Sequence, residues 1–202
     1  MTPWPYNDRP ADFSLPDFGL SPEDHQSLTD DIWQSLLKGY DDPDDFIESY
    51  LDEDFPLSEE EVRTAFDLML QVRLVQQAQW TAEETTTNLD RAFEELEEAG
   101  IVARQNFACC MNCGSSEIFD ERDDSREWRG YVFFHEQDTD RLIENGSVYL
   151  AYGAFSQTDL PQMVETDILP ALIRHGLRPD WDGDVNTRIR VDNAQWYAAC
   201  LR

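Results

Sequence analysis

The sequence predicts an α+β protein: a mainly antiparallel sheet of about four strands with helices packed on it, preceded by a helical, acidic N-terminal region. Three observations lead to this prediction. Apolar residues recur at helical spacing before Gly100, whereas after it they alternate or run together, as is typical of strands. Five of the ten prolines fall in residues 1–28. Acidic residues are concentrated in the first half of the chain.

These observations divide the chain into three regions. Residues 1–28 are expected to form a proline-rich extended arm that docks loosely, because proline lacks an N–H group and disfavours helix in the residue before it. Residues 29–84 should form an acidic helical region. Residues 85–202 should form the α+β domain.

Capping patterns and apolar spacing locate the helices. A helix from Ser58 to about Trp80 is predicted because Ser58 and Glu61 match a capping box and apolar residues follow at intervals of three and four. A second capped helix should run from Thr87 to Gly100, where glycine can end it. The other expected helices are Thr29–Lys38, 139–144 and 158–174, the last kinked by Pro170.

Four segments after Gly100 have the composition of strands and should share one sheet. They are Ile101–Phe107, Gly130–His135, Ser147–Tyr152 and Thr187–Val191. The polar segment 120–129 is predicted to be a surface loop that joins the first two strands as a hairpin.

Charge is the strongest compositional feature of the chain. The sequence has 43 acidic and 15 basic residues, a net charge of −28, and residues 1–100 alone carry −21. Residues 41–61 contain eleven acidic residues and no basic one. Repulsion disfavours direct binding to nucleic acid or to an anionic membrane, and the same surface could attract a basic protein partner. A merely solubilising surface is the simpler explanation.

Composition also indicates a cytoplasmic protein. No apolar run approaches the roughly 18 residues that a membrane span needs, and residues 1–10 lack the pattern of a secretory signal. Four cysteines are too few and too clustered for a disulfide framework in a chain of this length. We therefore expect reduced thiols or metal ligands.

The cysteines form the densest group of reactive side chains. Cys110 and Cys113 have the two-residue gap with which two thiolates can hold one metal ion. Zinc needs four ligands, and because no second such pair exists, Cys109, His135 or Cys200 would have to complete the site. Buried reduced thiols without any cofactor are the alternative that we favour. A redox pair is disfavoured, since that motif normally opens a helix and a glycine turn is expected here.

A second candidate site consists of His135, Asp138 and Thr139. An imidazole beside carboxylates and a hydroxyl could support acid–base chemistry. Asp138 and Thr139 are equally suited to cap a helix, so a structural role stays open.

Several runs of residues also resemble a known family. They are Asn106–Gly114, with its Cys109, Cys110 and Cys113, then Gly130–Thr139 and Tyr149–Gly153. Together they resemble an uncharacterised bacterial domain family of unknown function, over roughly residues 85–200 and without the acidic N-terminal region. The resemblance implies a shared fold and carries no assigned activity.

Two hypotheses about function follow. The first is a non-enzymatic interaction or regulatory protein that docks a basic partner on its acidic surface. The alternative is a metal-dependent or acid–base enzyme that uses Cys110, Cys113, His135 and Asp138.

Overall fold

The computed structural model describes residues 5–51, 55–155 and 159–201. The chain divides into two compact units: unit 1 is Met1–Thr85 with Tyr197–Arg202, and unit 2 is Thr86–Trp196. The last residues of the chain thus belong with the N-terminal helices. Within the described ranges, no helix has both the length and the apolar character needed to cross a membrane.

Unit 1 is helical. It contains the short 3-10 helix η1 (Pro5–Asn7) and the helices α1 (Pro22–Leu37), α2 (Pro43–Tyr50), α3 (Glu59–Gln77) and α4 (Ala82–Thr85). The predicted capping box of α3 is confirmed, with the Ser58 hydroxyl and the Glu61 carboxylate each bonding the other residue's backbone N–H. The core of this unit includes the fully buried Leu28, Ile32, Leu36, Val62, Phe66 and Met69.

Helix α1 starts seven residues before the predicted Thr29. Pro22 occupies the first turn, where its missing N–H would have had no helical partner, and the Ser21 hydroxyl accepts a hydrogen bond from the backbone N–H of Asp24. The same proline that was interpreted as a helix breaker therefore begins a helix. Ahead of it, the chain is held by contacts: Leu15 is 4% exposed, and the Trp33 indole donates to the Asn7 carbonyl at 3.0 Å.

Unit 2 confirms the α+β class. Its five-stranded mixed sheet has the order β1-β2-β3-β5-β4. The strands are β1 (Ile101–Arg104), β2 (Gly130–Phe133), β3 (Ser147–Ala154), β4 (Arg178–Asp180) and β5 (Ile189–Asp192). The helices are α5 (Asn88–Glu98), α6 (Met111–Glu117), α7 (Glu136–Asn145), α8 (Leu160–Met163) and α9 (Leu169–Arg174), with the 3-10 turn η2 (Ile118–Glu121) and the π-helical turn η3 (Val164–Ile168).

The sheet differs from the prediction in one pairing. Strand β1 runs parallel to β2, with Ile101 opposite Gly130 and Arg104 opposite Phe133, so these strands do not form a hairpin. Parallel neighbours need a crossover connection, and α6 with η2 supplies it. The fifth strand, β4, was missed because Pro179 lies within it; it is tolerated there because β4 is at the edge of the sheet.

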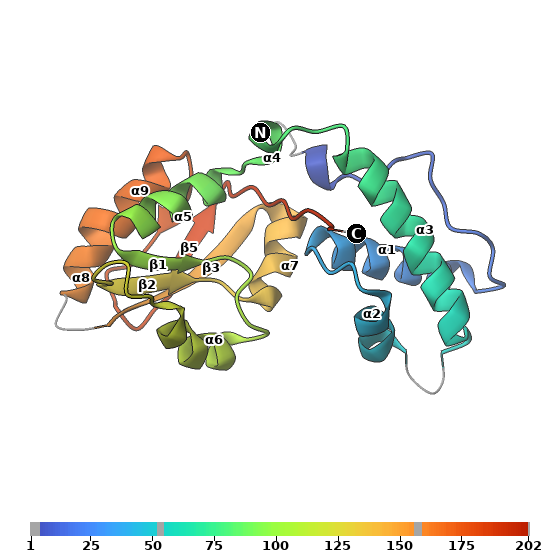
Figure 1. Ribbon diagram of the computed structural model, residues 1–202, viewed down its shortest axis with the longest axis horizontal. Coiled ribbons are helices and arrows are strands. Elements are labelled where there is room, and N and C mark those ends of the chain that lie inside the picture. The colour runs from blue at the N-terminus through green and yellow to red at the C-terminus, as the bar shows by residue number, and fades with distance from the viewer. Residues whose placement is uncertain (1–4, 52–54, 156–158, 202) are drawn as a thin grey trace. The chain divides into compact units, whose positions relative to one another are not determined.

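Helices cover both faces of the sheet (Figure 1): α5 and α9 lie on one side and α6 lies on the other. On the α6 side, Val102, Ile118, Phe133 and Ala151 form a buried cluster. On the other side, the Phe93 ring of α5 meets the Phe134 ring edge to face at 6.1 Å. Apolar side chains therefore pack on both faces of the sheet next to β1 and β2.

The remaining helices match their sequence signals. Helix α7 ends at Gly146, whose φ of 70° is the left-handed conformation that glycine adopts without strain. The predicted interruption by Pro170 is present as η3, the π-helical turn that directly precedes the first turn of α9. The extra residue in that turn accommodates the missing proline N–H.

Candidate functional site

The candidate residues gather at one edge of the sheet because β1 and β2 are parallel. Residues 105–110 follow the carboxyl end of β1 and lead into α6, and His135 follows the carboxyl end of β2 and precedes α7. Loops at the carboxyl ends of parallel strands are where ligand sites of open sheets commonly form. The cysteine segment and the histidine segment thus leave the sheet side by side.

Backbone hydrogen bonds tie these two segments together. The Phe107 N–H donates to the Phe134 carbonyl at 2.8 Å, and the Glu136 N–H donates to the Ala108 carbonyl at 3.2 Å. In the loop that follows β1, φ is 50° at Asn106 and 60° at Ala108, and non-glycine residues seldom adopt these values. The loop is therefore held in a specific and unfavourable conformation by its contacts.

Three cysteines converge in this loop and the first turn of α6. The sulfur atoms of Cys109, Cys110 and Cys113 all lie within 4.8 Å of one another, and the Cys109 and Cys113 sulfurs are 3.6 Å apart. Cys109 is exposed and the other two are partly exposed. A disulfide needs about 2.05 Å between sulfurs, so all three are free thiols.

The structure corrects the expected glycine turn. Cys110 is the N-cap of α6, in an extended conformation, and Cys113 lies in the first turn. Gly114 lies inside this helix, and a larger residue would not fit there because a Cβ would lie 2.5 Å from the Phe133 ring. The motif does open a helix that follows a strand, so the expectation that disfavoured a redox pair is wrong on this point.

The thiols of the cluster differ in acidity. The pKa of Cys110 is lowered, chiefly by the backbone N–H of Cys113, then by the Cys113 side chain and the backbone N–H of Asn112. The pKa of Cys113 is raised to about 11, chiefly by hydrogen bonding with Cys109 and then Cys110. Because a thiolate is the metal ligand, a bound cation would have to displace the Cys113 proton.

His135 lies in a separate buried polar group. It is 6% exposed, and its Nε2 is 3.1 Å from the Asp138 carboxylate, which also accepts from Arg188 at 2.7 Å. The guanidinium of Arg188 lies over the Tyr149 ring. The other ring nitrogen, Nδ1, is buried and has no hydrogen-bond partner among the described residues. An imidazole held in this way can accept a proton or ligate a metal through Nδ1.

Thr139 has a structural place beside this group. It is fully buried, and its hydroxyl donates to the Asn106 side chain at 2.6 Å, which adds a third link between the two segments. Sequence reasoning missed Asn106 and Arg188 as contributors. Arg188 precedes β5, 50 residues after Asp138, so no local pattern connects the two.

The four predicted metal ligands do not all meet. His135 is outside the set of described ligand atoms that lie within 4.8 Å of one another. The other proposed ligand, Cys200, belongs to unit 1, where its buried thiol contacts the Leu36 carbonyl. The structure therefore brings together three cysteines, and it places the His135–Asp138 pair on the adjoining segment.

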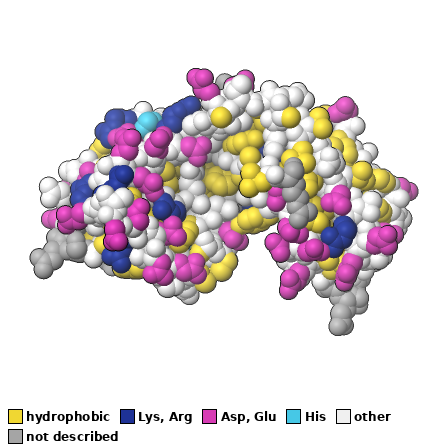
Figure 2. All heavy atoms as spheres, in the orientation of Figure 1, with side chains coloured by type: hydrophobic (Ala, Val, Ile, Leu, Met, Phe, Trp, Pro, Cys, Tyr) yellow, Lys and Arg dark blue, Asp and Glu magenta, His cyan; other side chains and the backbone are white. Residues whose placement is uncertain are grey.

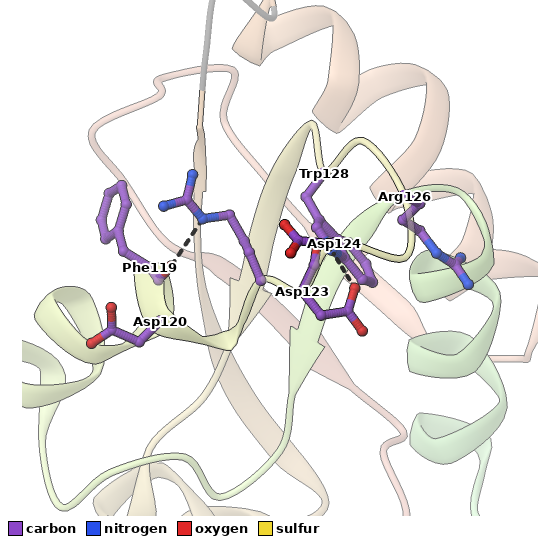
Figure 3. Close-up of a pocket in the computed structure, with 7 residues that line it drawn as sticks. Phe119, Asp120, Asp123, Asp124, Arg126 and Trp128 are labelled. Carbon is purple, nitrogen blue, oxygen red and sulfur yellow. Dashed lines mark hydrogen bonds between the residues drawn. The ribbon is translucent and has the colours of Figure 1, made fainter.

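A separate surface cavity of about 430 Å³ lies along residues 119–128 (Figure 3). Its walls include Phe119 and Trp128, and the Trp128 indole donates to Asp123. Arg122 donates to the Phe119 carbonyl and lies 4.6 Å from the Phe155 ring centroid. The other arginine, Arg126, donates to the Glu97 carbonyl at 2.6 Å, so both arginines are already engaged, and none of the candidate residues lines the cavity.

Comparison with known proteins places the chain in a family. A family model described as Domain of unknown function (DUF6891) matches residues 21–198. The chain belongs to this family. The resemblance implied that the acidic helical region lies outside the family domain. The DUF6891 match corrects this, because it begins at the N-cap of α1 and so includes that region. No curated protein and no solved structure matches the chain.

Proposed function

We propose that this DUF6891 protein binds one thiophilic metal ion, of which zinc is the best candidate, through Cys109, Cys110 and Cys113. The observation that carries the proposal is the grouping of three sulfur atoms within 4.8 Å of one another. Thiolates select zinc, copper(I) or iron–sulfur clusters over harder cations. Zinc–sulfur bonds of about 2.3 Å in a tetrahedron place sulfurs about 3.8 Å apart, close to the 3.6 Å between Cys109 and Cys113.

The fourth ligand in this proposal is Nδ1 of His135. Metal-bound histidines commonly donate their other ring N–H to a carboxylate, and Asp138 is in position to accept it from Nε2. An unsatisfied buried nitrogen costs about 1–3 kcal/mol, which a metal bond would relieve. Residues 105–110 would have to close toward His135, because the nitrogen is outside the compact sulfur group.

The metal would serve mainly as a structural or regulatory link in an interaction protein. It would join the segment after β1 to the start of α7, beside the Glu136–Ala108 hydrogen bond. All four cysteines are free, which suits a reducing compartment such as the cytosol. A cytosolic location is therefore part of the proposal.

The test is metal analysis by native mass spectrometry on protein purified without chelator. We expect one zinc per chain, loss of zinc from Cys113→Ser, and retention by the matched control Cys200→Ser. A chelator should lower the melting temperature of the wild type, because metal affinity is then part of the folding free energy. Metal-free protein that takes up no added zinc and melts identically with and without chelator would refute the proposal.

A second candidate function, docking of a basic protein, is supported by the charge over α2. Asp44, Asp45 and Glu48 are exposed there, and Figure 2 shows acidic side chains gathered around this helix. A triple variant with Asn, Asn and Gln at these positions should lose salt-sensitive binding to an arginine-rich peptide. Neutralising the exposed Glu94, Glu98 and Asp180 removes as many charges from unit 2 and is the matched control. Equal losses in both variants would mean that only net charge matters.

A further inference from the structure

The exposed Cys109 and its neighbour Cys113 have the arrangement of an oxidant-sensitive thiol pair. Cys109 is exposed, and its sulfur lies 3.6 Å from that of Cys113. Cysteines that sense oxidants are accessible to solvent and have a second thiol close enough to resolve the first oxidation product. The exposure of Cys109 and its distance from Cys113 meet these two conditions, and neither depends on a bound metal.

We propose that hydroperoxides convert Cys109 and Cys113 into a reversible disulfide, and that this bond expels the metal. The disulfide stands on the sulfur positions alone, whereas the expulsion rests on the proposed metal-binding function. The site is thereby an oxidative modification site on unit 2 whose substrate class is hydrogen peroxide or an organic hydroperoxide.

The chemistry proceeds in two balanced steps. The Cys109 thiol first loses its proton to solvent, and the thiolate attacks one peroxide oxygen, so that a sulfur–oxygen bond forms as the oxygen–oxygen bond breaks. The departing hydroxide or alkoxide takes up that proton and leaves as water or an alcohol. The Cys113 sulfur then attacks the sulfenic acid, a sulfur–sulfur bond forms as the sulfur–oxygen bond breaks, and the hydroxyl group leaves as water with the Cys113 thiol proton. Two electrons pass from the two sulfurs to the peroxide.

The geometry requires a small movement. The two sulfurs must approach by about 1.5 Å to reach the disulfide length of about 2.05 Å. Cys113 is fixed in the first turn of α6, whereas Cys109 precedes the N-cap in the loop that contains Ala108. The adjustment therefore falls on the loop and leaves the helix intact.

Oxidation removes two of the four proposed ligands, because the thiolate is the form that binds metal. Cys110 and His135 alone would remain. Loss of a single outer partner of a metal ligand weakens metal binding about 10–100-fold, so the loss of two direct ligands should exceed about 100-fold. Reduction of the disulfide should restore the original affinity.

The sequence permits a direct test of the pairing in metal-free, reduced protein. Treatment with hydrogen peroxide should lower the intact mass by about 2 Da for one disulfide. Trypsin leaves all three cysteines in the peptide 105–122, and cyanogen bromide then cuts after Met111, between Cys110 and Cys113. Fragments 105–111 and 112–122 that separate only after reduction report a disulfide to Cys113, whereas a peptide left uncut because Met111 is oxidised to the sulfoxide does not separate on reduction.

Variants identify the partner. Joined fragments should persist in Cys110→Ser and Cys200→Ser and disappear in Cys109→Ser. Persistence in Cys109→Ser with loss in Cys110→Ser would overturn the proposal by assigning the bond to Cys110. Absence of joined fragments in the wild type would overturn it as well, and because that measurement needs no folded variant, a destabilised mutant cannot obscure the result.

Zinc-loaded wild-type protein tests whether the disulfide expels the metal. Peroxide should release zinc to a chromophoric chelator, and a thiol reductant should restore binding. Protein that forms the disulfide but never binds zinc would refute the proposed function and leave the modification site standing. Protein that binds zinc but forms no disulfide would refute this inference alone.

Discussion

Replacing the buried Arg73 by alanine should destabilise unit 1 far more than replacing the exposed Arg63 on the same helix. The Arg73 side chain of α3 is fully buried. Its Nη1 donates to the Tyr6 carbonyl at 2.5 Å and its Nη2 to the Ala198 carbonyl at 3.4 Å. One guanidinium therefore joins the N-terminal arm and the end of the chain to the same helix.

Aromatic rings provide the rest of its environment. The guanidinium carbon lies 5.8 Å from the Trp33 ring centroid, 5.4 Å from that of Trp80 and 5.2 Å from that of Tyr197. Burial lowers the pKa of Arg73, which means that desolvation opposes its charge. The Nε atom, moreover, has no hydrogen-bond partner among the described residues. The cation is stabilised by carbonyl dipoles and rings in place of a carboxylate.

These contacts set the size of the effect. Hydrogen bonds from a charged donor contribute about 1.5–3 kcal/mol each, and the 3.4 Å bond should fall below that range. Three cation–π contacts add roughly 0.5–1 kcal/mol each, and truncation leaves a cavity. Relief of the desolvation penalty and of the unpaired Nε offsets part of the loss. We expect a net decrease of about 3–5 kcal/mol in the free energy of unfolding of unit 1.

Urea denaturation followed by tryptophan fluorescence measures this change. Arg63→Ala is the matched control, because Arg63 lies on the same helix, is 40% exposed and forms a surface ion pair with Asp44. It should lose far less stability than Arg73→Ala, because solvent screens an exposed ion pair. Arg73→Lys should fall between the two, since a lysine cannot reproduce the planar fork. Indistinguishable losses from Arg73→Ala and Arg63→Ala would refute the reasoning.

Three further changes probe unit 2 and the end of the chain. Gly114→Ala should lower the melting temperature, because the added Cβ would lie 2.5 Å from the Phe133 ring. The clash should cost about 1–3 kcal/mol, which outweighs the gain of about 1 kcal/mol in helix propensity. A higher melting temperature would show that α6 can shift away from Phe133. Phe93→Ala should cost about 3 kcal/mol by chemical denaturation, since this side chain is 4% exposed, whereas Glu97→Ala should cost less than about 1 kcal/mol; similar values would mean that the buried face of α5 is misassigned. Burial raises the pKa of the Cys200 thiol from about 9 to about 11. The stability that the neutral buried thiol contributes is therefore intact below pH 9 and is lost as the pH rises to 11. The free energy of unfolding should fall by up to about 3 kcal/mol over this range. Cys200→Ala should flatten this part of the pH profile, and an unchanged profile would assign the loss to other groups.

Helices with local signals were predictable from the sequence. The capping boxes at Ser58 and Thr87 each place a hydroxyl three residues before a carboxylate, and both are formed in the structure. The spacing of Phe93 and Leu96 in the sequence likewise predicts that they share one apolar face of this helix, and both are buried. In these cases the partners are a few residues apart, so the sequence itself contains the interaction.

Helix α6 was not predictable for the opposite reason. Its sequence contains Gly114 and two serines, which have modest helix propensity, and its N-cap Cys110 is not a usual capping residue. In the structure, Gly114 allows this helix to lie so close to Phe133 of β2 that an added Cβ would be 2.5 Å from the ring. Tertiary contact overrides local propensity here, and with it the interpretation of Cys110 and Cys113 changes.

The strand pairing decides whether the two candidate constellations can act together. In the predicted hairpin, the carboxyl end of β1 would lie beside the amino end of β2, and His135 would lie at the opposite edge of the sheet. A strand of four residues is about 13 Å long, which is too far for the Cys109 and His135 side chains to share one metal ion. In the observed parallel pairing, Arg104 is opposite Phe133, so both segments leave the sheet at the same edge and the Glu136 N–H reaches the Ala108 carbonyl. No property of either segment alone contains this information. A joint site depends on the crossover through α6, a connection that the local sequence pattern did not reveal.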